Sequence, residues 1–183
     1  EHVAEDVLEL YNRLAFKEWV PLRVSEQDLT LGLRRATADE ARQAEDYLAR
    51  LEKNHEEGDV TTKCYARHTI ASYRFPSTRT IKIQAIGIGG FGICTIPSEI
   101  YLFTGHNIRS YTPYESSFII SLANGSNGYV PPIHHFAIGG YTTWRGSSNF
   151  VPESEPLIRA KCLAMLEELY HMDNESGAPV GIR

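Results

Sequence analysis

The stretch IKIQAIGIGGFGICTIPSE, from Ile81 to Glu99, decides the fold expected of this chain of 183 residues. Apolar residues alternate up to the pair Gly89-Gly90, and a second apolar run then leads to Pro97. Alternation with a period of two indicates a β-strand, and paired glycines between two such runs indicate a tight turn. The sequence therefore predicts a β-hairpin whose second strand ends beside a carboxylate, that of Glu99.

Outward from this hairpin, helical and strand patterns alternate along the chain. Thr37-Ala38-Asp39-Glu40 is a capping box and predicts a helix that runs to about Lys53. Phe118–Ala123 is a nearly continuous apolar run, as expected of a buried central strand. The other expected elements are a strand over 22–33, helices over 3–19, 60–73, 98–111 and 153–171, and a long loop over 124–140. Such interleaving predicts a layered α/β or α+β fold, with a mixed β-sheet and flanking helices.

The overall composition narrows the class of protein. A hydrophobic content of 42% and a charged content of 22% are ordinary for a soluble globular domain. The net charge of −5, with no basic cluster larger than Arg34-Arg35, argues against nucleic acid as a partner. No apolar run approaches the ~20 residues that span a bilayer, so no transmembrane segment is expected. The first residues lack the pattern of a signal peptide, and the start looks cut from something longer.

The three cysteines, Cys64, Cys94 and Cys162, are far apart in the sequence. They form no CxxC pair, which argues against a zinc knuckle or a redox motif. We expect them to be small buried hydrophobic residues. The cysteines therefore do not indicate the cellular compartment of the protein.

Glu99 is the first candidate for a chemical role. It follows Pro97 in the expected strand-to-helix corner, where the helix dipole would keep its carboxylate ionised. An ionised carboxylate beside a strand end is a suitable ligand for zinc. The alternative is that Glu99 only caps its own helix.

Two tyrosines and a pair of histidines are further candidates. Tyr129 follows a glycine-rich turn. Its phenol oxygen could coordinate a metal ion, or donate or accept a hydrogen bond. Tyr141 could donate to the oxyanion of a reacting carbonyl. Either tyrosine could instead serve only to pack its loop. His134 and His135 are adjacent, and neighbouring side chains on extended backbone point in different directions, which disfavours joint binding of one ion.

A series of short motifs, in this order and spacing, resembles the neutral (non-lysosomal) ceramidase family of zinc amidases. The motifs are Ile83-Gln84-Ala85, Ile96-Pro97-Ser98-Glu99, Leu122-Ala123-Asn124, Gly128-Tyr129-Val130 and Tyr141. The resemblance covers about residues 80–172. It implies that residues 1–183 are a single domain or fragment, the C-terminal part of a larger catalytic domain that hydrolyses the amide of N-acylsphingosine.

The resemblance also assigns roles to residues of this chain. In the family, the matching Glu and the first matching Tyr complete a zinc site that two upstream histidines begin. Glu99 and Tyr129 are then implied to be metal ligands for Zn2+, and Tyr141 to be the catalytic residue that hydrogen-bonds the oxyanion. The family's serine and two histidines lie in an N-terminal part that we do not find here. That part is the implied partner, and the chain alone is expected to be inactive.

The chain also departs from the family pattern. Pro131-Pro132 replaces a Thr-rich stretch after the Tyr, and Ile100-Tyr101 replaces Phe-Thr after the Glu. These changes leave the substrate open between ceramide, another lipid amide and a different small molecule. One rival is a different metallohydrolase in which His134 or His135 joins Glu99, and another is a non-catalytic binding or structural relative. A homo-oligomer is expected if the docking surface for the N-terminal part is exposed. The resemblance favours a secreted or periplasmic location.

Overall fold

The computed structural model describes residues 2–175. The helices are α1 (His2–Arg13), α2 (Ala38–Lys53), α3 (Val60–Tyr73), α4 (Leu102–Tyr111), α5 (His135–Ile138), the 3-10 helix η1 (Tyr141–Thr143) and α6 (Ser154–Glu175). The strands are β1 (Leu22–Gly32), β2 (Thr78–Ile88), β3 (Phe91–Ile96), β4 (Glu99–Ile100), β5 (Ser116–Ser121) and β6 (Tyr129–Val130). None of the helices within residues 2–175 is long and apolar enough to cross a membrane.

A four-stranded mixed sheet of order β1-β2-β3-β5 forms the centre of the molecule. Strands β1, β2 and β3 pair antiparallel, and β5 pairs parallel with β3. The β2–β3 hairpin turns at Gly89, whose φ of 58° is the left-handed conformation that glycine adopts without strain. The predicted fold class and the predicted hairpin are therefore confirmed.

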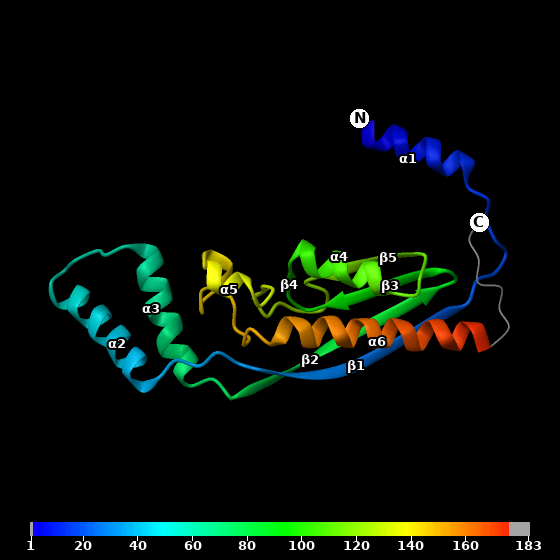
Figure 1. Ribbon diagram of the computed structural model, residues 1–183. Coiled ribbons are helices and arrows are strands. Elements are labelled where there is room, and N and C mark those ends of the chain that lie inside the picture. The colour runs from blue at the N-terminus through cyan, green and yellow to red at the C-terminus, as the bar shows by residue number, and fades with distance from the viewer. Residues whose placement is uncertain (1, 176–183) are drawn as a thin grey trace.

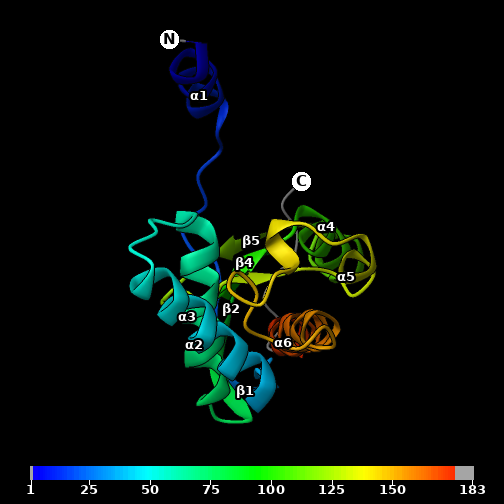
Figure 2. The same cartoon turned by 90° about the vertical axis from the view of Figure 1, so that its left-hand side faces the viewer.

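Helix α6 covers one face of this sheet, as Figures 1 and 2 show from two directions. Because side chains alternate across a strand, Leu31, Ile83 and Cys94 all point toward that helix, and all three are buried. Cys162 and Leu166 of α6 meet them in the same core. The backbone approaches closely here, since a Cβ on Gly92 would lie 2.6 Å from the ring of Tyr114. One contiguous core therefore fixes the sheet against α6.

The opposite face of the sheet carries exposed apolar side chains. By the strand register, Leu22, Val24 and Ile88 share this face with Phe118 and Ile120 of β5, and all five are exposed. The apolar run at 118–123 was predicted to be a central buried strand, and this prediction is wrong. Strand β5 lies at the end of the strand order, and the apolar residues on its open face have no described layer over them.

Helices α2 and α3 pack together and form an excursion between β1 and β2 (Figure 1). The predicted capping box is present, because Thr37 Oγ1 accepts from the Glu40 amide and the Glu40 carboxylate accepts from the Thr37 amide. Asp59 caps α3 without the reciprocal bond, since its carboxylate accepts from the Thr62 amide. Each cap satisfies amide groups that a helix start leaves free. The predicted helices at about 40–53 and 60–73 are thus confirmed.

The N-terminal helix is shorter than predicted. Helix α1 ends at Arg13, whereas the apolar spacing predicted a helix over 3–19. Both views show α1 apart from the sheet, and each of its described side chains is exposed. Apolar spacing alone does not fix where such a helix ends, because most helical stability in proteins comes from packing against a core.

The cysteines follow the prediction at two positions and depart from it at the third. Cys94 and Cys162 are buried in the core between β3 and α6. Cys64 on α3 is exposed, contrary to the prediction. Its helix packs on α2 through another face, on which Ala66 is buried.

Candidate functional site

The site is built around a second, two-stranded sheet. Strand β4 pairs parallel with β6, and the register places Glu99 opposite Tyr129. The Glu99 amide donates to the carbonyl of Gly128 at 3.0 Å, and the Tyr129 amide donates to the carbonyl of Ser147 at 2.8 Å. Residues 30 positions apart in the sequence are thereby neighbours in space.

This pairing corrects the prediction of a helix over 98–111. Glu99 lies in a strand, and helix α4 begins only at Leu102 with Tyr101 as its N-cap. The expectation that a helix dipole acts on Glu99 is wrong, and so is the alternative that Glu99 caps its own helix. Hydrogen bonding to the 128–130 segment holds Glu99 in extended conformation, and sequence periodicity does not report such a contact.

The side chains of Glu99 and Tyr129 interact directly. The hydrogen bond that Tyr129 donates to Glu99 raises the pKa of the phenol above its ordinary value, and the negative charge of Glu99 adds to this effect. A carboxylate oxygen and a phenol oxygen thus converge on one point at the ends of paired strands.

Asn127 shapes the turn that leads into Tyr129. Its side-chain amide donates to the carbonyl of Pro97 at 2.7 Å, and its side-chain oxygen accepts from Arg79 at 3.1 Å. Gly128 follows with a φ of 81°, and a Cβ there would lie 2.4 Å from the carbonyl oxygen of Ser147. Only glycine fits this position without displacing the backbone that pairs with Tyr129.

Tyr141 lies beside Tyr129. Their ring centroids are 5.8 Å apart in an edge-to-face arrangement, and Tyr141 starts the short helix η1. Tyr141 is 58% exposed, so its side chain is accessible to a ligand. The structure therefore brings Glu99, Tyr129 and Tyr141 into one cluster. The long loop predicted over 124–140 contains β6 and α5, which help to form this cluster.

The histidine pair lies at the edge of the cluster. The ring of His135 contacts that of Tyr101 with centroids 4.8 Å apart, and the ring of His134 contacts that of Phe103 at 5.4 Å. Across the described residues 2–175, no group of three or more His, Cys, Asp or Glu side chains could hold a metal ion. Glu99, His134 and His135 therefore do not form a three-ligand group in this part of the chain.

A cavity of about 310 Å³ adjoins Tyr141 on the side of helix α3. Cys64, Tyr65 and His68 line it from α3, and Ser147 lines it from the loop after η1. Burial lowers the pKa of His68 below its ordinary value, which favours the neutral imidazole. A ligand that reaches Tyr141 thus has space beside it, bounded by aromatic and neutral polar groups.

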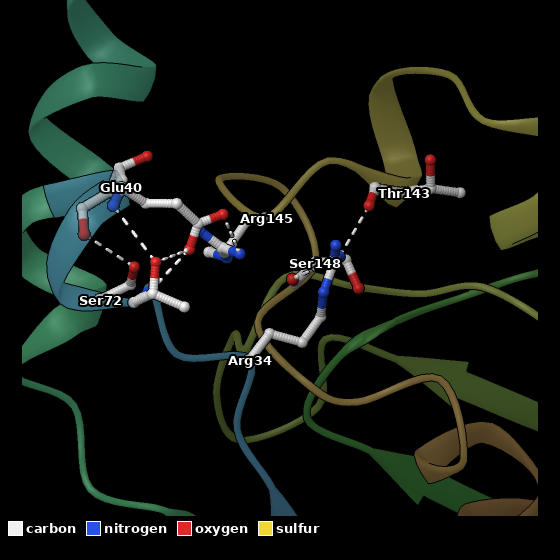
Figure 3. A network of polar contacts seen from close by, with 8 residues as sticks. Arg34, Glu40, Ser72, Thr143, Arg145 and Ser148 are labelled. Atoms are coloured by element: carbon white, nitrogen blue, oxygen red, sulfur yellow. Dashed lines mark hydrogen bonds and ion pairs between the residues drawn. The ribbon is translucent and has the colours of Figure 1, made fainter. Parts of the chain in front are cut away.

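A polar network joins the α2–α3 excursion to the loop that carries Tyr141 (Figure 3). Arg145 donates to Glu40 at 3.0 Å, and Arg34 donates to the carbonyls of Thr143 and Ser148 at 2.7 and 3.3 Å. The hydrogen bond from Arg145, followed by that from the Thr37 amide, lowers the pKa of Glu40 to about 2. Glu40 therefore remains ionised and paired with Arg145 at neutral pH.

Two solved ceramidase structures are similar to this chain. The chain is similar to the solved structure of neutral ceramidase from Pseudomonas aeruginosa, with a TM-score of 0.56 and 18% identity over 83% of this chain. It spans 29% of the length of that ceramidase chain. A structure described as a ceramidase complexed with C2 matches 58% of this chain and 16% of its own, with a TM-score of 0.45 and 19% identity.

No protein-family model and no curated protein sequence matches the chain. The second structural match is too distant to support an argument. The first match is a likeness of fold, and it confirms that the chain resembles part of a neutral ceramidase.

Proposed function

We propose that this chain supplies Glu99 and Tyr129 as metal ligands, and Tyr141 as an oxyanion donor, to a zinc-dependent amide hydrolase that acts on N-acylsphingosine. The observation that carries the proposal is the convergence of these three side chains from separate segments. It occurs on a fold similar to that of a neutral ceramidase of which the chain spans 29%. The remaining part of the protein would supply the other groups.

The donor groups fit a zinc ion. Carboxylate oxygen is a common zinc ligand, and the phenol oxygen of Tyr129 lies within hydrogen-bonding reach of Glu99. A bound cation would favour the ionised phenol, which is opposite to the effect of Glu99 alone. Zinc sites have four ligands as a rule, so two further groups on the remaining part would complete the site.

The residues of this chain then have distinct tasks. When bound, zinc polarises the amide carbonyl and activates the attacking oxygen. Glu99 holds negative charge at the metal position, and the β4–β6 pairing fixes its direction. Tyr141 donates a hydrogen bond from its phenol to the oxygen that becomes negative in the tetrahedral intermediate. The cavity beside Tyr141 offers space for a part of the substrate.

The remaining part of the domain is the proposed partner. The exposed apolar face of the sheet, with Leu22, Val24, Ile88, Phe118 and Ile120, offers it a docking surface. In the isolated chain the same face would favour association of copies.

The test compares hydrolysis by two samples, the isolated chain of residues 1–183 and the longer protein that contains it. With a short-chain fluorescent ceramide, we expect turnover by the longer protein and little or none by the isolated chain, because half a metal site does not hold zinc. Liberated fluorescent fatty acid is measured by chromatography. Robust turnover by the isolated chain, or none by the longer protein, would contradict the proposal.

A matched variant distinguishes the rival metallohydrolase. Replacing His134 and His135 together with alanine in the longer protein should leave bound zinc unchanged, since neither histidine is a proposed ligand. Loss of zinc in this variant would favour the rival in which one of them joins Glu99.

A further inference from the structure

The loop that carries Tyr141 contains two adjacent glycines on its N-terminal side. Gly139 and Gly140 precede Tyr141 with φ values of 82° and 102°. A Cβ at either position would meet no atom within 4 Å. Two glycines in open space give the backbone conformational freedom, so the position of Tyr141 must be set by other contacts.

Tyr141 itself contacts the rings of Tyr129 and Trp144, and Arg34 holds the backbone on its C-terminal side. The guanidinium of Arg34 donates to the carbonyl of Thr143, the last residue of η1, and to that of Ser148 (Figure 3). Thr143 also donates to the carbonyl of Gly140, which closes the short turn around Tyr141. One side chain therefore holds both ends of the segment from Thr143 to Ser148.

Arg34 also contacts the chain before the glycines. Its guanidinium lies 5.1 Å from the ring centroid of Phe136 on α5, a cation–π distance. Arg34 thus touches the chain on both sides of Gly139-Gly140. This arrangement would compensate for the freedom of the glycine pair.

The position of Arg34 is itself well determined. Arg34 follows shortly after the end of β1, and its backbone amide donates to the carbonyl of Asn149 at 2.8 Å. Burial lowers the pKa of the guanidinium, with a contribution from the positive charge of Arg145, but arginine stays protonated in proteins. A partly buried cation with two carbonyl acceptors is costly to place unless its hydrogen bonds form.

We propose that Arg34 is a positioning residue for Tyr141, acting through the carbonyls of Thr143 and Ser148 and the ring of Phe136. This inference rests on the proposed function only for the role of Tyr141. The hydroxyls of Tyr101 and Thr142 also form a hydrogen bond, which restrains the middle of η1. Tyr101 also contacts both sides of the glycine pair, because its ring meets that of His135. Arg34 differs in that it binds backbone carbonyls at both ends of the segment from Thr143 to Ser148.

The kinetic test uses Arg34→Met in the longer protein. We expect kcat to fall about 10- to 100-fold with KM changed less than about threefold, since a displaced donor weakens the transition state more than the bound substrate. In a Tyr141→Phe background the same substitution should lower kcat by less than about threefold, because the group it positions is absent. An equal fall in both backgrounds would overturn the proposal.

Hydrogen exchange provides a readout independent of activity. The amides of Thr143, Trp144, Ser147 and Ser148 donate within the loop, so their exchange reports its order. In Arg34→Met we expect exchange of this segment to increase about tenfold. Unchanged exchange would overturn the positioning role alone. Full turnover by Tyr141→Phe would instead overturn the proposed catalytic role of Tyr141, so the two failures are distinguishable.

Two further variants serve as a control and as a conservative replacement. Arg35→Met removes the neighbouring guanidinium, which donates to the carbonyl of Tyr73 on the exposed side, and should change neither kcat nor loop exchange. Arg34→Lys keeps the charge but lacks the planar fork that reaches two carbonyls, so it should give an intermediate loss of kcat. An equal loss in Arg35→Met and Arg34→Met would overturn the proposal.

Discussion

Amide hydrolysis by the longer protein is expected to fall at least about 10³-fold when Glu99 is replaced by glutamine, because several kcal/mol of transition-state stabilisation depend on the metal. The glutamine amide keeps the size of the side chain but is a neutral and weaker ligand. It also removes the charge that faces Tyr129 in the β4–β6 pair. The measurement is kcat/KM on the fluorescent ceramide.

The matched control is Glu153→Gln, which changes an exposed carboxylate just before α6. It should retain the activity of the parent protein. Unchanged hydrolysis in Glu99→Gln would exclude Glu99 as a ligand. If the amount of bound zinc were also unchanged in this variant, a non-catalytic relative of the ceramidase fold would be favoured.

Replacing Tyr141 with phenylalanine is expected to lower kcat by about 10²- to 10³-fold, the effect of removing one oxyanion donor. Because the ring is retained, its edge-to-face contact with Tyr129 and the packing of the loop should persist. Bound zinc should therefore remain at the parent level, which separates this defect from that of Glu99→Gln. Steady-state kinetics and zinc analysis on the same sample measure both.

Tyr111→Phe serves as the control for loss of a phenol, since Tyr111 lies at the end of α4 and is 72% exposed. It should have parental kcat. A kcat in Tyr141→Phe equal to that of Tyr111→Phe would remove Tyr141 from the mechanism.

The parts of the fold that local rules determine were predictable from the sequence. The β2–β3 hairpin follows from strand alternation and the Gly89-Gly90 turn, and helix α2 from its capping box. The exposure of one face of β5 was not predictable in this way. Its apolar residues resemble those of a central strand, but the number of layers on a sheet depends on other segments.

The proximity of the candidate residues is consistent with the sequence motifs, but the geometry of the cluster was not predictable from them. The order of motifs points to Glu99, Tyr129 and Tyr141, and the structure brings these residues together. The two-residue strands β4 and β6 carry no periodic signal, because such short pairing depends on contacts between distant segments.

Two residues that shape the site were missed. Asn127 supports the turn before Tyr129, and Arg34 contacts the Tyr141 loop. In the sequence Arg34 is one of a pair of adjacent arginines, and nothing distinguishes it from Arg35. Their difference arises where β1 ends, since one guanidinium turns toward the loop and the other toward Tyr73.

The most direct test of the account is the zinc content of metal-replete, gel-filtered protein, measured by elemental analysis. We predict about one zinc per molecule of the longer protein, well below that in its Glu99→Gln and Tyr129→Phe variants, and essentially none in the isolated chain of residues 1–183. Parental zinc in both variants, or near-stoichiometric zinc in the isolated chain, would contradict the claim that Glu99 and Tyr129 form one half of a shared metal site.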